Sequence, residues 1–140
     1  MRIGLYNGVF DLLHRGHLYA LREARRQCDW LVVAVNTDES VAKLKGPDRP
    51  YQPLQVRMWR MWHAGCAHAL IPYDGWLENL IVTVKPQVLF KGWDHPIDIT
   101  KGVNQVASGL GAEIVQLQQL AGYSTTEIAR SAAAGVKQAL

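Results

Sequence analysis

Apolar residues form short continuous runs that alternate with longer segments in which they recur every three or four residues. Leu31–Val35 is a continuous apolar run ending at Asn36, the pattern of a parallel strand buried on both faces. The longer segments carry charged residues on their other side, which predicts amphipathic helices. We expect strands at 2–6, 31–35, 69–71, 88–90 and 113–117, and helices at 17–27, 54–64, 76–84, 98–110 and 124–140.

This alternation predicts an α/β fold, a doubly wound, Rossmann-like parallel sheet of five strands with helices on both faces. We expect one domain over residues 1–140, because the chain shows no repeat, low-complexity tract or linker. Asp38 should cap a short helical turn. Residues 43–53 contain three prolines and a glycine and are predicted to be a loop.

Polar residues follow four of the expected strands, at 7–17, 36–53, 91–95 and 122–126. In doubly wound sheets, ligands bind beyond the carboxyl ends of the strands. We therefore expect these four loops to meet at one rim and to form a ligand site there.

Two histidines, His14 and His17, stand where the first strand would turn into a helix. A helix N-terminus attracts anions, and Gly8 and Gly16 allow close approach of the backbone. Two imidazoles beside a phosphorus can stabilise the charge that develops during in-line displacement. Two alternatives stay open: a capping histidine next to a surface histidine, and a zinc pair, for which no third ligand lies nearby in sequence.

Further candidates carry similar alternatives. Lys43 and Lys45 are suited to close over a phosphate, or they belong to a solvated basic loop. Arg57 is expected to reach the rim, and Asp11 caps the turn or orients a histidine.

The last two loops of the rim offer a carboxylate and a helix start. After the fourth strand, Gly92 is a small residue, and Asp94 supplies a carboxylate that can bind a ribose hydroxyl, a lysine or a metal. The run Ser124–Glu127 fits a capping box, and the helix N-terminus there can also bind phosphate.

Gly8–His17 resembles the G-x-F-D-x-x-H-x-G-H motif of the cytidylyltransferase-like nucleotidyltransferases, and Ser124–Ile128 resembles their S-T-T-x-I motif. The resemblance implies that an acceptor phosphate attacks the α-phosphorus of a nucleoside triphosphate and releases pyrophosphate as its Mg²⁺ complex, without metal ligands from protein side chains. It assigns catalysis to His14, His17 and Lys45, and substrate orientation to Asp11, Lys43 and Arg57. It assigns nucleotide binding to Gly8, Val9, Phe10, Gly16, Gly92, Asp94, Ser124, Thr125 and Thr126.

Two branches of the family compete. Asn7–Asp11, Leu44–Gly46 and Lys91–Asp94 resemble the adenylyltransferase domain of ADP-heptose synthase, which favours ATP and a sugar or polyol phosphate. The short chain and Thr37–Glu39 are similar to glycerol-3-phosphate cytidylyltransferase, so CTP with a polyol phosphate is the alternative. A non-catalytic nucleotide-binding module is a third hypothesis. Trp93 and His68 differ from the residues usual in both branches.

Composition adds constraints. Apolar residues make up 49% and charged residues 19% of the chain, and the net charge of +3 suits an anionic small molecule. The sequence has no basic run interleaved with aromatic residues, so nucleic-acid binding is not expected. No apolar segment is long enough to span a membrane or to form a signal peptide. We expect a cytoplasmic protein with Cys28 and Cys66 reduced. Trp59 and Trp62 indicate a homodimer, unless they pack on the sheet.

Overall fold

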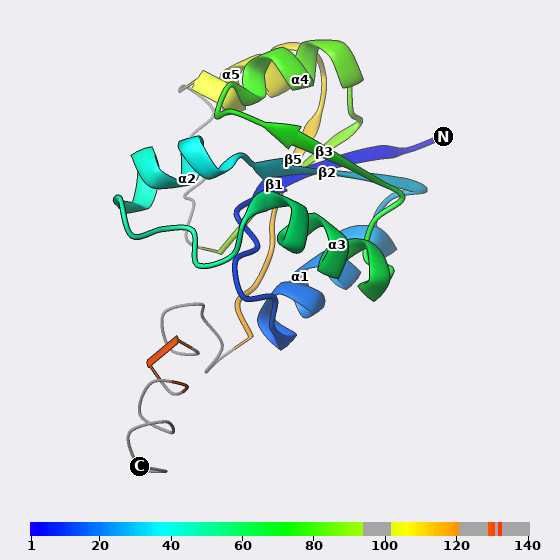
Figure 1. The fold of residues 1–140 in the computed structure, drawn as a ribbon. Coiled ribbons are helices and arrows are strands. Elements are labelled where there is room, and N and C mark those ends of the chain that lie inside the picture. The colour runs from blue at the N-terminus through cyan, green and yellow to red at the C-terminus, as the bar shows by residue number, and fades with distance from the viewer. Residues whose placement is uncertain (94–101, 121–128, 131, 133–140) are drawn as a thin grey trace, which may run out of the picture.

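The computed structural model describes residues 1–93, 102–120, 129, 130 and 132. Its centre is a sheet of five strands, all parallel, in the order β3-β2-β1-β4-β5 (Figure 1). The strands are β1 (Ile3–Gly8), β2 (Trp30–Asn36), β3 (Ala69–Tyr73), β4 (Val88–Lys91) and β5 (Glu113–Gln116). The doubly wound fold is confirmed, and the direction of winding reverses between β1 and β4.

Helices cover both faces of the sheet. They are α1 (Arg15–Arg26), α2 (Asp38–Lys45), α3 (Leu54–Ala64), α4 (Leu77–Val84) and α5 (Gly102–Gly109). Figure 1 shows α1 and α3 on one face and α4 and α5 on the other. Alternation along β2 explains this, because Val33 packs with α1 and α3 whereas Val32 and Ala34 pack with α4 and α5. The continuous apolar run in β2 predicted a strand that is buried on both faces of the sheet, and the structure confirms this prediction.

Several element boundaries differ from the expected ones. The first strand continues to Gly8, so Asn7 and Gly8 belong to the sheet and not to a loop. The first helix begins at Arg15, two residues before the expected start at His17, because His14 supplies its cap. Of the expected last helix, residues 129, 130 and 132 are helical, and the remainder lies outside the described residues.

The prediction of a loop at 43–53 is wrong for its first three residues. Lys43, Leu44 and Lys45 form the end of α2, a helix of eight residues whose N-cap is Thr37 and not Asp38. Lysine and leucine are good helix formers, and the first residue that stops the helix is Gly46, at φ 107°. The prolines act only after that point, so the loop is shorter than the composition of the segment suggested.

Candidate active site

The two histidines of the motif lie in direct contact at the start of α1. Their rings are stacked, with centroids 3.8 Å apart and planes inclined by 25°. The N–H of Gly16 donates to His14 Nδ1 at 3.0 Å, and the N–H of His14 donates to His17 Nδ1 at 3.3 Å. His14 is thus a capping residue, as one alternative held, but His17 is its partner in a reciprocal cap and not a separate surface residue.

This cap fixes the tautomer of both rings. Each Nδ1 accepts a backbone hydrogen bond, so in the neutral tautomer each ring carries its proton on Nε2. Burial, followed by the charges of His14 and Lys45, lowers the pKa of His17 from about 6.5 to about 3. His17 is therefore a neutral imidazole at pH 7, and its Nε2–H is a donor of the kind that a phosphoryl oxygen accepts.

Protonation of His17 couples the stability of the fold to pH. The unfolded chain binds the proton near pH 6.5, whereas the folded chain stays neutral until about pH 3. The folded state binds fewer protons in this window, so stability that is present above pH 6.5 is lost as the pH falls towards 3. Urea titrations at several pH values should show a steeper loss for the wild type than for His17→Gln. His63→Gln, which replaces an exposed histidine of α3, is the control, and equal slopes in wild type and His17→Gln would refute the coupling.

The loop before the histidines is held in an unusual conformation. Phe10 and Leu12 both have a positive φ angle, 53° and 51°, which residues other than glycine rarely adopt. Between them, the buried carboxylate of Asp11 accepts hydrogen bonds from the N–H of Tyr51 at 2.7 Å and of Gln52 at 3.0 Å. Asp11 therefore fastens this loop to the segment after α2, while the cap of α1 is His14 and not Asp11.

The glycines and Phe10 also shape this loop. The ring of Phe10 packs edge-on against His17, at 5.6 Å between centroids. A Cβ atom at Gly8 would lie 2.9 Å from that ring, so Gly8 is needed for the position of Phe10. The N–H of Gly16, expected to face a phosphate, is bonded to His14 in this conformation.

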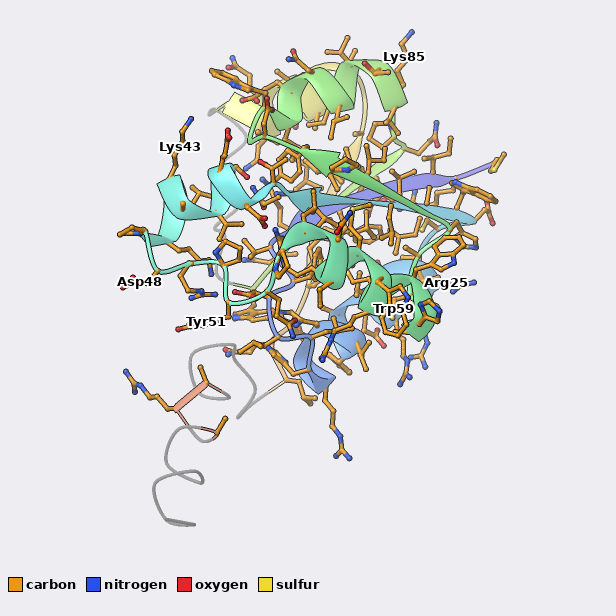
Figure 2. All side chains as sticks on the ribbon, viewed as in Figure 1. Arg25, Lys43, Asp48, Tyr51, Trp59 and Lys85 are labelled. Carbon is orange, nitrogen blue, oxygen red and sulfur yellow. The ribbon has the colours of Figure 1, made fainter. Side chains whose placement is uncertain are left out.

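The two lysines of α2 have different surroundings. Both are exposed, but residues two apart on a helix point to different sides, so they cannot close over one ligand together as a flexible loop would allow. The charge of Lys45 helps to lower the pKa of His17, so its electrostatic effect reaches the histidine pair. Lys43 projects outward from α2 (Figure 2).

Arg57 reaches the rim but is fully buried beneath it. Its guanidinium donates to the carbonyls of Val9 and Asn36, both at 2.8 Å, and to that of Gln52 at 2.9 Å. It also pairs with Asp38 at 2.7 Å. These bonds join the loops after β1 and β2 to the segment before α3. Arg57 is therefore a residue that positions the site from below.

The remaining predicted residues divide into two groups. Gly92 is buried directly after β4, next to β1 at the reversal of the sheet. Asp94, Ser124, Thr125 and Thr126 lie outside the described residues. Within the part of the chain that is described, no group of three or more His, Cys, Asp or Glu side chains could hold a metal ion.

Other expectations concern residues away from the rim. Cys28 and Cys66 are free thiols, as predicted. Trp59 and Trp62 are exposed on α3, so the alternative that they pack on the sheet is wrong, and the homodimer stays a prediction.

No helix in the described residues has the length and apolarity needed to cross a membrane. His68 accepts the N–H of Leu31 and stacks on Trp30, so it serves the start of β2.

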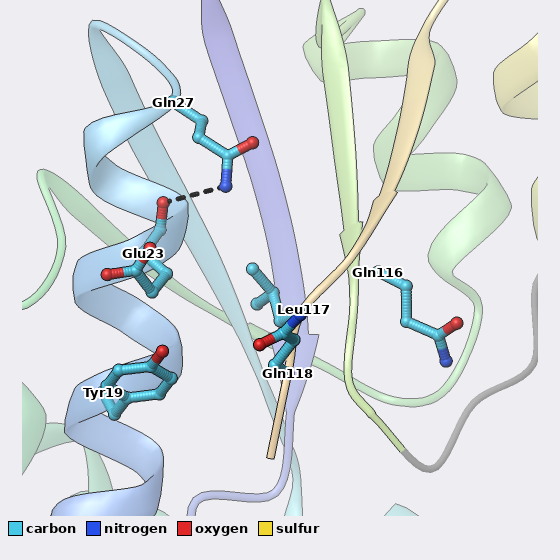
Figure 3. A pocket seen from close by; sticks show the side chains of 6 residues that line it. All are labelled: Tyr19, Glu23, Gln27, Gln116, Leu117 and Gln118. Carbon is cyan, nitrogen blue, oxygen red and sulfur yellow. Dashed lines mark hydrogen bonds between the residues drawn. The ribbon is translucent and has the colours of Figure 1, made fainter. Parts of the chain in front are cut away.

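A polar cavity of about 260 Å³ lies between α1 and the end of β5 (Figure 3). It is lined by Tyr19, Glu23, Gln27, Gln116, Leu117 and Gln118. None of the predicted site residues lines it, so it is separate from the histidine pair.

Sequence reasoning placed Asn36 and Lys91 among the polar residues of the rim without naming either as a site residue, and it missed Tyr73. Asn36 and Tyr73 join Asn7 in a hydrogen-bond chain, and Lys91 ends β4 beside β1. The signal was present, because each is a polar residue at the carboxyl end of an apolar run.

A parallel sheet whose reversal point adjoins a helix-capping pair of histidines is the framework of a nucleotidyltransferase. The chain belongs to the cytidylyltransferase-like family, whose model matches residues 5–131. It is 42% identical over 128 residues to the bifunctional protein HldE of Pseudomonas putida strain F1, and 40% identical over 129 residues to HldE of Vibrio vulnificus strain YJ016. Each match covers 91% of this chain but 27% of the relative, so the chain spans about a quarter of the length of these proteins.

Solved structures agree with the family. The lipopolysaccharide core biosynthesis protein from Thermoplasma volcanium GSS1 superposes with a TM-score of 0.74 at 28% identity, over 86% of this chain and 98% of that one. Pantothenate synthetase from Thermus thermophilus has a TM-score of 0.51 at 20% identity, over 83% of this chain and 55% of that one, which is a likeness of fold alone.

Proposed function

We propose that the protein transfers a nucleotidyl group, with ATP as the favoured donor, to the phosphate of a sugar or polyol and releases pyrophosphate. The observation that carries this proposal is the stacked pair of His14 and His17, with a neutral His17, beside the reversal of the sheet. A neutral donor fixed by a backbone cap is preorganised, so it needs no rearrangement when charge develops on an α-phosphate. The resemblance of Leu44–Gly46 and Lys91–Asp94 to the adenylyltransferase branch supports ATP over CTP.

In this mechanism an oxygen of the acceptor phosphate attacks the α-phosphorus in line, and the bond to the β-phosphate oxygen breaks. His14 and His17 stabilise the charge on the equatorial oxygens, and Lys45 at the end of α2 orients the phosphates. We infer that Mg²⁺ enters with the triphosphate, whose oxygens are ligands it prefers, and neutralises part of the phosphate charge. The reaction uses positioning and electrostatics and needs no covalent intermediate.

Pyrophosphate release tests the proposal directly. The full chain is incubated with each of four nucleoside triphosphates and a panel of sugar and polyol phosphates. Release with ATP and a sugar or polyol phosphate is the expected result. Release with CTP and glycerol 3-phosphate would establish the cytidylyl alternative. Nucleotide binding without release from any pair would indicate a non-catalytic module and contradict the proposal.

A further inference from the structure

Polar side chains also line the carboxyl end of the sheet on the face turned away from α1. Leu5, Ala34 and Leu89 pack in the core beneath α4 and α5. Because side chains alternate along a strand, the residues two positions further on, Asn7, Asn36 and Lys91, lie on the same face. Tyr73, at the end of β3, packs against this core as well. We call these four residues, Asn7, Asn36, Tyr73 and Lys91, the polar row.

The strand register places the members of the polar row side by side. Asn36 is paired directly with Tyr73 between β2 and β3. Tyr6 is paired with Phe90, so the next residues along, Asn7 and Lys91, are neighbours across the reversal of the sheet. The polar row therefore crosses the same end of the sheet as the proposed nucleotidyl site, on its other face.

A directed chain of hydrogen bonds orients Asn7. The amide of Asn7 donates to the Tyr73 hydroxyl at 2.8 Å, and that hydroxyl donates to Asn36 Oδ1 at 3.1 Å. Asn36 in turn donates to the hydroxyl of Ser40 at 3.1 Å, at the buried end of the chain. Asn7 is half-buried, and its Oδ1 accepts no hydrogen bond from any residue that the structure describes. These hydrogen bonds thus hold the Asn7 amide in place, and no residue in the described ranges occupies the oxygen that a ligand would use.

Lys91 adds a basic side chain to the neutral groups. It is half-buried, and burial lowers its pKa while Glu78, in the first turn of α4, raises it. A lysine donates hydrogen bonds and the Oδ1 of Asn7 accepts them, so these two side chains together offer both functions. Amides and a phenol beside a single lysine suit hydroxyl groups, which also donate and accept. A phosphate favours clustered cations, and a quaternary ammonium favours an aromatic cage.

We propose that the polar row selects the acceptor by binding the hydroxyl groups of its sugar or polyol part. Asn7 and Lys91 contact the hydroxyls, and Tyr73 and Asn36 are positioning residues that hold Asn7. This inference rests on the proposed function and names the part of the acceptor that the chain recognises. The location supports it, since Asn7 directly precedes Gly8 at the centre of the rim.

Calorimetry of the full chain tests the polar row without turnover. The probes are mannose 1-phosphate, ribitol 5-phosphate and glycerol 3-phosphate, with inorganic phosphate and ATP as controls. Tyr73→Phe removes one hydroxyl and keeps the ring, so it should weaken binding of the preferred sugar or polyol phosphate by roughly tenfold. The Kd values for inorganic phosphate and ATP should not change. Thr83→Val, which removes an exposed hydroxyl on α4, should leave every Kd as in the wild type.

Lys91→Met provides a second test that does not depend on the hydrogen-bond chain. It should also weaken binding of the sugar or polyol phosphate while ATP still binds. Unchanged acceptor binding in both Tyr73→Phe and Lys91→Met would overturn the proposal, as would a wild type that binds ATP but none of the three acceptors. Failure of the proposed function looks different, because acceptor and ATP would bind and no pyrophosphate would be released.

Discussion

Replacing His17 by alanine should lower the turnover number by about two orders of magnitude or more, as for removal of one preorganised donor to a developing oxyanion. His17 is neutral at pH 7 with its proton on Nε2, so it donates a hydrogen bond without carrying a charge that would bind the substrate tightly before reaction. The loss should therefore appear mainly in kcat, with a smaller change in KM for the triphosphate. Pyrophosphate release measured at saturating substrates gives kcat, and its dependence on triphosphate concentration gives KM.

His17→Asn separates this catalytic role from the capping role. The asparagine oxygen can stand where Nδ1 stands and accept the N–H of His14, but nothing replaces the donor at Nε2. If His17 serves the transition state, His17→Asn should keep the stability of the wild type and still lose turnover as severely as His17→Ala. Near-normal turnover in a folded His17→Asn or His17→Ala would show that His17 caps the helix and has no catalytic role. His63→Ala, at an exposed position on α3, controls for histidine loss in general.

The fold could be predicted from the sequence because a strand buried in a parallel sheet has a recognisable residue pattern. The run Leu31–Val35 is apolar on both faces, and the helices carry their apolar residues at regular intervals, so element order and sheet type follow without knowledge of contacts. The histidine spacing likewise indicated the site. It left open whether the pair caps or catalyses, since the same three-residue spacing serves both roles, and the structure shows the cap.

The positioning residues were harder to predict because their partners are distant in sequence. Arg57 was expected to reach the rim, but nothing in the sequence indicates that its side chain is buried there. Its bonds to Asn36 and Val9 span 21 and 48 residues and become visible only when the loops meet. The polar row required the strand order as well, because only the pairing of β1 with β4 brings Lys91 beside Asn7.

Arg57→Ala should reduce the free energy of unfolding by about 3–5 kcal/mol, mainly because several backbone carbonyl groups lose their hydrogen-bond donor. Truncation leaves the carbonyls of Val9, Asn36 and Gln52 without their donor, and a buried acceptor left unsatisfied costs about 1–3 kcal/mol. Asp38 adds little, because its side chain is 48% exposed and water can replace the lost partner. Urea unfolding curves, analysed for midpoint and slope, measure the change.

Three further variants locate the origin of that loss. Asp38→Asn removes the ion pair alone and should cost under about 1 kcal/mol. Arg57→Lys keeps the charge but lacks the planar fork that reaches several carbonyls at once, so it should remain strongly destabilised. Arg60→Ala, at an exposed arginine on the same helix, should stay within about 0.5 kcal/mol of the wild type. If Arg57→Lys were as stable as the wild type, the charge and not the set of carbonyl bonds would hold the loops, and the assignment of Arg57 as their common anchor would fail.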